Sequence, residues 1–339
     1  MKVQENIPLK SLTTFGVGGI ATHYTEVGNE EDLRSALNFA NRKKLPTFVL
    51  GEGSNVLISD HKLKVLVIRL INREIRFENN KVIAGGGVNW DKLVDKCVNR
   101  GLQGIECLSG IPGTVGAAPY QNIGAYGQEL KDTFLELKAY DLKLNKFVVL
   151  TKNDCKFGYR DSVFKDPKYK NCYIIFKVAL KLHKNKKPKI SYESLKKNLE
   201  ENNIKDPSLK QVRESVLKIR AQKLVDPKKI GNAGSFFKNP IVETSVLKKI
   251  QEKNPDVPSF PADDHKVKLF AGWLIEKAGW KGRKYCGAAV SDKNALVLIN
   301  KGGKATCDDV TKLAGQIVRD VKAKFDVELS PEVQLISYV

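Results

Sequence analysis

The sequence is poor in metal-ligating patterns and has no long apolar run. Its six cysteines never form a C-x-x-C pair, and its four histidines are widely dispersed. This spacing disfavours both a metal site and a disulfide framework. No apolar run is long enough to span a membrane, and the first residues, MKVQENIPLKSLTTFGVGG, contain no apolar core of a signal peptide. We therefore expect a reduced, soluble, cytoplasmic protein without a metal or a membrane partner.

Acidic residues are too few to balance the basic ones. Lys and Arg number 58 against 38 Asp and Glu, which leaves a net charge of +20. Such an excess favours phosphate-bearing partners, although a lysine-biased proteome would also produce it. The lysines are scattered, and the chain has no long basic arm or aromatic-interleaved RNA motif. A small anionic substrate satisfies this charge equally well, so we expect no nucleic-acid partner.

The pattern of apolar residues predicts a mixed α+β fold. A chain of 339 residues is too long for one ordinary core, so two or three domains are expected. In the first hundred residues, helical periodicity alternates with short apolar runs typical of strands. The predicted elements are helices at 33–40 and 90–98, the second capped by Asn89 and stopped at Gly101, and strands at 47–50, 56–58 and 64–70.

The rest of the chain shows a similar mixture. Residues 131–183 are predicted to form strands interrupted by a loop at 156–165, and residues 183–207 are polar and peripheral. Ser208 and Gln211 form a capping box that begins a helix reaching about Leu224. The predicted C-terminal elements are a helix capped by Asp308, a strand from Phe325 to Leu329 and a short strand after Ser330-Pro331.

A glycine-rich segment, GEGSN, joins two of the predicted strands. Gly51, Gly53, Ser54 and Asn55 lie in it, and successive backbone N–H groups in such a turn can form a nest for a diphosphate. It is not the Rossmann fingerprint, because the chain returns to a strand at Val56 instead of opening a helix. The alternative is a tight hairpin turn.

A second segment, SGIPGTVGAAPYQNIGAYG (109–127), is too rich in Gly, Pro and Ala for a regular element and is expected to be a functional loop. Its small residues let the backbone approach a flat or phosphorylated ligand. Two such loops predict that the protein binds one long cofactor. Gly85 to Gly87, by contrast, are predicted to form a turn at the end of a strand. The glycines of the second loop are Gly110, Gly113, Gly116, Gly124 and Gly127.

Charged residues near these segments have either a structural or a functional interpretation. On the helix from Ser208, Arg213 and Arg220 project from the same side, and partly buried cations need anionic partners. Structural ion pairing is the preferred interpretation of Arg213. Arg220 and Lys223 instead lie shortly before a further glycine-rich loop, which favours a functional role. Arg160, in GYRDSVFK, either pairs with Asp161 or points into a cleft. Glu332, in LSPEVQLI, could be an ordinary surface carboxylate.

An ordered set of motifs resembles the UDP-N-acetylenolpyruvoylglucosamine reductase family. The motifs span nearly the whole chain, and their order makes the match specific. They are GEGSN (51–55), SGIPGTVGA (109–117), QNIGAYG (121–127), GYRDSVFK (158–165), GNAGSFFKNP (231–240) and PEV (331–333).

The resemblance implies an FAD-dependent enzyme of peptidoglycan synthesis, with a role in cell shape and division. It would use NADPH to reduce the enolpyruvyl ether of UDP-N-acetylglucosamine to UDP-N-acetylmuramate. The implied fold is a vanillyl-alcohol-oxidase-type (PCMH) FAD-binding domain of two subdomains, followed by an α+β substrate-binding domain. The expected boundaries are 1–72 for the first subdomain, with 331–339 packing back on it, 73–222 for the second and 223–330 for the substrate domain.

The resemblance also implies roles for individual residues. Arg160 and a protonated Glu332 would stabilise the substrate carboxylate as negative charge develops, and Ser235 would donate the proton. Tyr192, a mobile tyrosine in the longer class of the family, would bind the nucleotide sugar with Lys223, Asn239 and Arg220. Non-covalent FAD would be bound by Gly51, Gly53, Ser54, Asn55, Pro112, Gly113, Thr114, Gly116, Asn122, Gly124 and Tyr126, with Tyr126 also open to the substrate.

Several points remain alternatives. Lys223 or Lys238 could assist Ser235, and Lys223 could also bind the phosphates of NADPH. The family often has Pro, His and Arg where this chain has Val225, Ser291 and Gln334. Phe236 and Phe237 are expected to lie in a core and not on a ligand.

Competing functions are an FAD-dependent oxidoreductase for a small alcohol or hydroxy acid, and a basic nucleic-acid-binding module; a monomer is expected.

Overall fold

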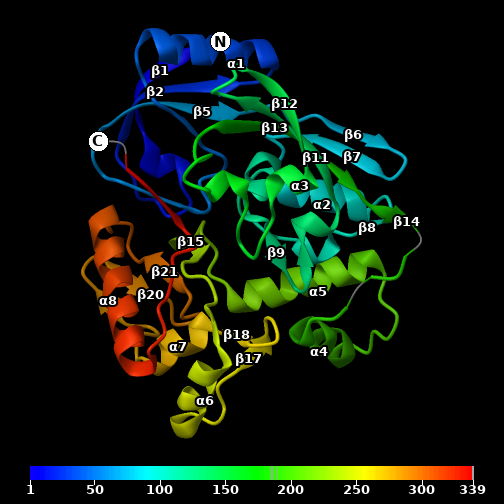
Figure 1. The fold of residues 1–339 in the computed structure, drawn as a ribbon, viewed down its shortest axis with the longest axis vertical. Helices are drawn as coiled ribbons and strands as arrows, with labels where there is room; N and C mark the ends of the chain where they lie inside the picture. Colours follow the sequence, from blue (N-terminus) through cyan, green and yellow to red (C-terminus); the bar gives the residue numbers. More distant parts are fainter. Residues whose placement is uncertain (185, 189, 338–339) are drawn as a thin grey trace. The chain divides into compact units, whose positions relative to one another are not determined.

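A computed structural model describes residues 1–184, 186–188 and 190–337 (Figure 1). The chain forms two compact units. Unit 1 contains residues 1–7, 21–52 and 64–222, and unit 2 contains residues 8–20 and 53–63 together with the chain from residue 223 onward. The chain therefore passes between the units several times. The linear boundaries expected at residues 72 and 330 stay predictions.

The first sheet of unit 1 is covered by one helix. Helix α1 (Glu30–Arg42) lies along this sheet (Figure 1), and its buried residues pack with Leu66 and Ile68 of the sheet. Asn29 caps α1 by accepting a hydrogen bond from the Asp32 N–H. The predicted helix and strands are thus confirmed. The strand order is β1 (Val3–Pro8), β2 (Ile20–Val27), β5 (Leu63–Leu70) and β3 (Thr47–Val49).

The second sheet of unit 1 is antiparallel throughout. It confirms the strands predicted between residues 131 and 183. The predicted interruption at 156–165 contains one short helical turn, η5 (Val163–Lys165), and another, α3 (Lys152–Cys155), comes just before it. Its strand order is β12 (Lys146–Thr151), β11 (Phe134–Asp141), β13 (Tyr173–Lys181), β7 (Lys81–Gly85) and β6 (Ile75–Glu78).

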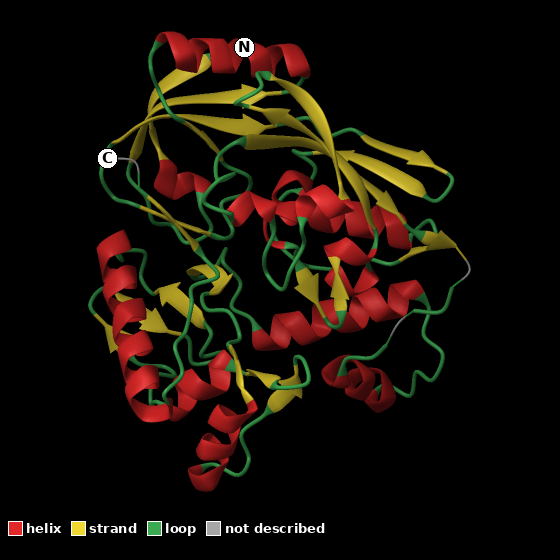
Figure 2. Ribbon diagram, viewed as in Figure 1, coloured by secondary structure: helices red, strands yellow, loops and turns green. Residues whose placement is uncertain are grey.

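Capping signals mark the start of two further helices of unit 1 (Figure 2). In α2 (Trp90–Val98), the Asn89 side chain accepts from the Lys92 N–H at 2.9 Å, and Gly101 has a left-handed φ of 67°. Ser208 and Gln211 exchange the capping-box bonds predicted for α5 (Leu209–Lys223). Helix α4 (Glu193–Glu201) lies in the polar segment that follows β14 (His183–Lys184).

The loop at 109–127 is more regular than predicted. Residues Val115–Gln121 form a 3-10 helix, η3, whose buried side chains are Val115, Ala118 and Pro119. Asn122 ends it in the left-handed region, with φ 44°. The small residues thus form an apolar face that packs inside unit 1, which composition alone did not reveal. A two-residue strand, β9 (Gly124–Ala125), then pairs with β10 (Gln128–Glu129).

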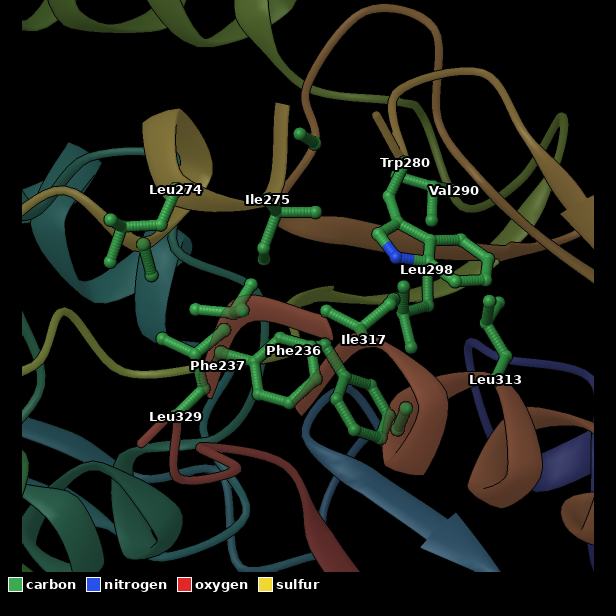
Figure 3. Packing of buried hydrophobic residues seen from close by; sticks show 14 of the residues in the cluster. Phe236, Phe237, Leu274, Ile275, Trp280, Val290, Leu298, Leu313, Ile317 and Leu329 are labelled. Atoms are coloured by element: carbon green, nitrogen blue, oxygen red, sulfur yellow. The ribbon is translucent and has the colours of Figure 1, made fainter. Parts of the chain in front are cut away.

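Unit 2 is a small α+β unit with its own core. Phe236 and Phe237 are buried there with Trp280 and Ile317, as predicted for the two phenylalanines (Figure 3). The main sheet has the order β15 (Gly231–Ser235), β21 (Val297–Asn300), β20 (Ala288–Val290) and β19 (Lys284–Tyr285), and the smaller sheet has β16 (Ile241–Glu243), β18 (Lys266–Leu269) and β17 (Ser259–Pro261). Its helices are α6 (Thr244–Lys253), α7 (Ala271–Lys277) and α8 (Cys307–Phe325).

Two C-terminal predictions are wrong. Thr306, not Asp308, caps α8, because its side chain accepts from the Asp309 N–H in a capping box. The strand predicted from Phe325 does not form: Phe325 continues the buried stripe of α8, and Asp326 ends the helix with a left-handed φ of 56°. The short terminal strand is confirmed as β22 (Gln334–Ile336), which pairs in parallel with β4 (Val56–Ile58).

The described residues show no feature of a membrane or metal protein. None of their helices combines the length and apolar character needed to cross a bilayer. No three His, Cys, Asp or Glu side chains among them gather in a group that could hold a metal ion. All six cysteines lie in this part of the chain and carry free thiols.

Candidate active site

The GEGSN segment is an open turn and not a hairpin. Its flanking strands have different partners, since β3 pairs with β5 and β4 pairs with β22, so the hairpin interpretation is wrong. Gly53 has a φ of 64°, and a Cβ there would lie 2.2 Å from the Leu12 carbonyl oxygen. Among the described residues, the backbone N–H groups of residues 51–54 donate to no other group. This arrangement fits a nest for the diphosphate of FAD.

Glu52 connects this turn to the second glycine-rich loop. Its carboxylate accepts from the Asn89 side-chain amide at 2.7 Å and from the Gly113 N–H at 3.0 Å. A Cβ at Gly51 would lie only 2.9 Å from the Thr114 hydroxyl oxygen. Because both loops lie side by side through these contacts, unit 1 holds them at a fixed separation. Sequence reasoning did not single out Glu52, whose partners are far away in the chain.

The glycines of the second loop serve close packing within the chain. A Cβ at Gly116 would lie 3.0 Å from the Ile175 carbonyl oxygen, and one at Gly124 would lie 2.9 Å from an Arg160 nitrogen. Asn122 is fully buried, and its side-chain amide donates to Glu129 and to the Gly158 carbonyl. The Asn122 side-chain amide is thus engaged in hydrogen bonds within the protein. Any cofactor contact at this residue would therefore come from its backbone.

Arg160 lies against the QNIGAYG part of this loop. Its Nη2 donates to the Gly124 carbonyl at 2.6 Å, and Lys165 Nζ donates to the Arg160 carbonyl at 2.9 Å. Arg160 has a left-handed φ of 51°, which is uncommon for a residue with a side chain and costs free energy. The surrounding contacts, and not a local backbone preference, therefore hold Arg160 in this conformation.

Tyr126, Tyr192 and Arg220 gather in unit 1. The rings of Tyr126 and Tyr192 meet edge to face, with centroids 5.5 Å apart. Burial raises the pKa of both tyrosines, and the Arg220 charge opposes this rise at Tyr126. Burial lowers the pKa of Arg220, and the charges of Tyr126 and Asp91 oppose that effect. The predicted substrate residues Tyr192 and Arg220 are thus linked through Tyr126, in surroundings where an anionic ligand would complement the partly buried cation.

The predicted structural ion pair of Arg213 is confirmed. Arg213 donates from Nη1 and Nη2 to both carboxylate oxygens of Asp91, at 2.5 and 2.9 Å. Asp91 also accepts from the Gly110 N–H at 2.6 Å. Burial alone would raise the pKa of Asp91, but the hydrogen bonds from Arg213 and Gly110 and the Arg213 charge lower it. This pair joins α2 and α5 to the start of the second loop.

Ser235 and Glu332 come together in unit 2. Ser235 is the last residue of β15, and the Phe236 carbonyl that follows accepts from the Glu332 N–H at 2.8 Å. A β-bridge joins Phe237 to Pro331, and the Lys238 N–H donates to the Ser330 carbonyl at 2.9 Å. The segment with the predicted proton donor therefore pairs with the segment that carries the predicted carboxylic acid.

Asn55 fixes the other side of Glu332. Its side-chain amide donates to the Glu332 carbonyl at 3.3 Å, and its own carbonyl accepts from the Gln334 N–H at 3.0 Å. Asn55 was predicted to bind the cofactor. The structure shows that it supports the segment that carries Glu332, just before β22.

The remaining predicted residues belong to unit 2. Lys223 is the exposed last residue of α5, and Lys238 is half-buried. The Asn239 side-chain oxygen accepts from the Ala271 N–H at 3.0 Å, at the start of α7.

The three departures from the family pattern all make hydrogen bonds within the chain. Ser291 is fully buried, and its hydroxyl accepts from the Lys293 N–H at 3.1 Å within a turn. The Val225 carbonyl accepts from Asn232, and the Gln334 N–H donates to Asn55. The Ser291 side chain thus stabilises the turn in which it lies. Val225 and Gln334 are held through hydrogen bonds of their backbone atoms.

A glycine-rich turn with unused backbone N–H groups and a second glycine-rich loop beside it, within an α+β architecture, fit the class of FAD-binding oxidoreductases. Residues 21–143 match the FAD binding domain family, and residues 226–336 match the C-terminal domain of UDP-N-acetylenolpyruvoylglucosamine reductase. The predicted fold class and cofactor are confirmed. The chain belongs to the UDP-N-acetylenolpyruvoylglucosamine reductase family, as its relatives show.

Curated relatives named UDP-N-acetylenolpyruvoylglucosamine reductase match nearly the whole chain. The protein of Pseudomonas aeruginosa is 41% identical over 99% of this chain and 99% of its own length. That of Bdellovibrio bacteriovorus is 42% identical over 98% of this chain and 99% of its own length. Among solved structures, UDP-N-acetylenolpyruvylglucosamine reductase from Thermus caldophilus is similar with a TM-score of 0.70, 27% identity and coverage of 99% and 100% of the two chains.

Proposed function

We propose that this chain reduces the enolpyruvyl ether of UDP-N-acetylglucosamine to UDP-N-acetylmuramate with NADPH, as a step of peptidoglycan precursor synthesis. The observation that carries the proposal is the pairing of the Ser235 segment with the Glu332 segment. This pairing supports assigning the Ser235 hydroxyl and the Glu332 carboxyl to one site, because adding a proton next to a carboxylate needs a proton donor and a group that stabilises the developing charge. The full-length likeness to the named reductases supports the same substrate.

FAD supplies the redox chemistry: when bound, it accepts hydride from NADPH and delivers it to the vinyl carbon of the substrate. We assign the binding of its diphosphate to the backbone of residues 51–54 and to the loop that contains Pro112, Gly113, Thr114 and Gly116. The unused N–H groups of the first turn support this assignment, because a helix-free nest of this kind binds anionic oxygens.

Arg160 and Glu332 are assigned to the substrate carboxylate. Hydride addition leaves negative charge beside that carboxylate, and the charge spreads into its oxygens as an enolate-like species. Preorganised donors stabilise such charge without reorganising during the reaction. Arg160 donates from a guanidinium already fixed on the Gly124 carbonyl, and Glu332 donates when it is protonated.

Ser235 is assigned as the proton donor to the α-carbon, on the face opposite the flavin. Among the described residues no hydrogen bond of its hydroxyl is recorded, which leaves it available to a ligand. Serine is a weak acid, so its alkoxide needs a nearby cation or a relay to water. Lys223 and Lys238 are the candidates for that cation.

Tyr192, Arg220, Lys223 and Asn239 are assigned to the nucleotide sugar. The partly buried Arg220 supports binding of an anionic group, and Tyr192 contributes its ring edge beside Tyr126. The exposed ammonium of Lys223 fits a diphosphate or, in the other half-reaction, the phosphates of NADPH. Asn239 offers the amide hydrogens that α7 does not use.

The cellular setting is also part of the proposal. We infer a cytoplasmic monomer that contributes to cell shape and division through wall synthesis and does not bind nucleic acid. Cell fractionation and sedimentation of the purified protein test the first two statements. A filter-binding assay over a range of salt concentrations tests the third, because nucleic-acid binding would be strongly salt-dependent.

The visible spectrum of the purified protein tests the proposed activity. Under anaerobic conditions we expect a flavin spectrum that NADPH bleaches and that UDP-N-acetylglucosamine enolpyruvate restores, with formation of UDP-N-acetylmuramate. Bleaching by a small alcohol or hydroxy acid, with no response to NADPH, would favour the alternative oxidoreductase. A colourless protein with salt-dependent RNA binding would contradict both.

A further inference from the structure

A buried asparagine, Asn232, lies three residues before Ser235 and has no role in the proposed chemistry. Only 3% of it is exposed to solvent. Its side-chain amide donates to the carbonyls of Ile230 at 2.8 Å and Val225 at 3.2 Å, and its side-chain oxygen accepts from the Gly234 N–H at 3.0 Å. The polar atoms of the side chain are therefore all used within unit 2.

The bond to Gly234 crosses an irregularity in the strand. Asn232 pairs with Ile299 and Ser235 pairs with Val297, so two residues of β15 lie opposite one residue of β21. This is a β-bulge, and bulges redirect the side chains that follow them. Gly234, within the bulge, has a left-handed φ of 73°, and its N–H would lack this partner without Asn232. The Asn232 side chain therefore fixes the bulge immediately before Ser235.

The Asn232 backbone is held from a second direction. Its N–H donates to the Thr14 carbonyl at 3.1 Å, and the Thr14 hydroxyl donates to the Asn232 carbonyl at 2.7 Å. The Thr14 N–H donates in turn to the Gly53 carbonyl at 3.0 Å. Thr14 thus links Asn232 to the turn assigned to the FAD diphosphate.

We propose that Asn232, supported by Thr14, is the positioning residue that aims the Ser235 hydroxyl. It holds three segments of unit 2 together: the bulge before Ser235, the segment 225–230 that follows Lys223, and, through Thr14, the turn at Gly53. The inference rests on the proposed role of Ser235. It deepens that role by naming what fixes the direction of the hydroxyl.

Asn300 provides a matched control. It is equally buried, with 4% exposed, and it also donates twice and accepts once: its amide donates to the Phe15 and Gly16 carbonyls, and its oxygen accepts from the Ala305 N–H. None of these bonds reaches the bulge. Asn300→Ala therefore removes a comparable buried network without releasing Gly234.

The experiment measures both half-reactions of the holoenzyme by rapid mixing in Asn232→Ala, Asn300→Ala, Thr14→Val and Thr14→Ser. For Asn232→Ala we expect flavin reduction by NADPH at the wild-type rate and reoxidation by the enolpyruvyl substrate slower by about ten- to a hundredfold, as for a misplaced catalytic group. Thr14→Val should show the same selective loss to a smaller extent, and Thr14→Ser, which keeps the hydroxyl, should recover the rate. Asn300→Ala should lower the melting temperature without this selective loss.

Amide hydrogen exchange separates this inference from the proposed chemistry. The Gly234 amide should exchange faster in Asn232→Ala than in Asn300→Ala, whichever residue donates the proton. Equal kinetics in the two alanine variants, or a Gly234 amide that stays protected in Asn232→Ala, would overturn the positioning role. If Ser235→Ala slows both half-reactions equally while Gly234 still loses protection, the role assigned to Ser235 fails and the bulge contact stands. If Asn232→Ala does not fold, the comparison of Thr14→Val with Thr14→Ser decides.

Discussion

At the level of single residues, Glu332 illustrates how backbone contacts prepare a side chain for chemistry. Its N–H donates to the Phe236 carbonyl, and its carbonyl accepts from Asn55. The position of the carboxyl group is thus set by the two neighbouring segments. We assign this carboxyl a donor role, which a charged carboxylate could not perform.

Glu332→Gln tests whether a donor is what the reaction requires. Gln keeps the size of Glu and donates a hydrogen bond, whereas Ala removes the group entirely. We expect Glu332→Ala to lose on the order of a hundredfold or more in the rate of flavin reoxidation, as for loss of one oxyanion donor, and Glu332→Gln to lose clearly less. Steady-state and single-turnover rates of both variants give the comparison, and equal losses would argue against a protonated glutamate.

The sequence indicated the residues assigned to the chemistry better than the residues that hold them. Ser235, Glu332 and Arg160 lie in motifs that carry the resemblance to the reductase family. Glu52, Asn232 and Thr14 carry no such signal, because their partners lie far away in the chain: Thr14 bonds to a residue 218 positions later. Hydrogen bonds between distant segments depend on the tertiary fold and leave little trace in local composition.

At the level of elements, the two glycine-rich loops depend on one carboxylate. Glu52 accepts from Asn89 at the start of α2 and from the Gly113 N–H, so the position of each loop depends on the other. Local composition predicted both loops but not this link. It also missed the 3-10 helix Val115–Gln121, whose buried face becomes visible only once the loop packs in unit 1.

Glu52→Ala should weaken FAD binding. Without the carboxylate, the Gly113 N–H and the Asn89 amide lose their partner, and the loops must be ordered when the cofactor binds. A lost charge-assisted bond costs about 1.5–3 kcal/mol, which corresponds to a dissociation constant raised by roughly ten- to a hundredfold. Titration of apoprotein with FAD by flavin fluorescence measures this change. Glu52→Gln, which can still accept one of the bonds, should lie between wild type and Ala; unchanged affinity in Glu52→Ala would contradict the role.

The contact between α2 and α5 predicts a dependence of stability on pH. The pKa of Asp91 is lowered in the folded protein, so its pairing with Arg213 stabilises the fold fully above the ordinary Asp pKa of about 3.9. This contribution is lost as the pH falls through the lower, folded pKa. The Asp91–Arg213 pair should therefore contribute to the free energy of unfolding at neutral pH and no longer contribute in strong acid.

Asp91→Asn should thus lower the free energy of unfolding at neutral pH by about 1–3 kcal/mol, near the lower end because 32% of the Asp91 side chain is exposed. The difference from wild type should shrink below about pH 4. Urea unfolding at several pH values measures it. Asp95→Asn is the control, since Asp95 is half-exposed and meets Arg213 only through Nε, at 3.3 Å. An Asp91→Asn deficit that grows in acid would contradict the assignment.

At the level of the whole molecule, the compact units are not continuous stretches of sequence. Residues 8–20 and 53–63 belong to the same unit as the C-terminal part of the chain, partly because β4 pairs with β22. Periodicity predicted most helices and strands but could not predict this pairing. A parallel pair between residues 56–58 and 334–336 depends on tertiary contacts and has no local signal.

FAD binds the folded chain, so the cofactor should stabilise the protein against unfolding. A ligand that binds only the folded state raises the free energy of unfolding by about 2.7 kcal/mol at a free concentration one hundred times its dissociation constant. We expect the holoenzyme to melt at a higher temperature than the apoprotein, with the difference growing as free FAD is increased. Calorimetry of the two forms measures this, and identical melting curves would contradict the assignment.

The proton-donor role of Ser235 gives the most direct test of the proposed chemistry. In a double-mixing experiment, Ser235→Ala holoenzyme is first reduced by NADPH and then mixed with UDP-N-acetylglucosamine enolpyruvate while flavin absorbance is followed. We predict reduction at the wild-type rate and reoxidation slower by about a hundred- to ten-thousandfold, the range of general acid catalysis. Equal slowing of both steps, or reoxidation at the wild-type rate, would contradict Ser235 as the donor.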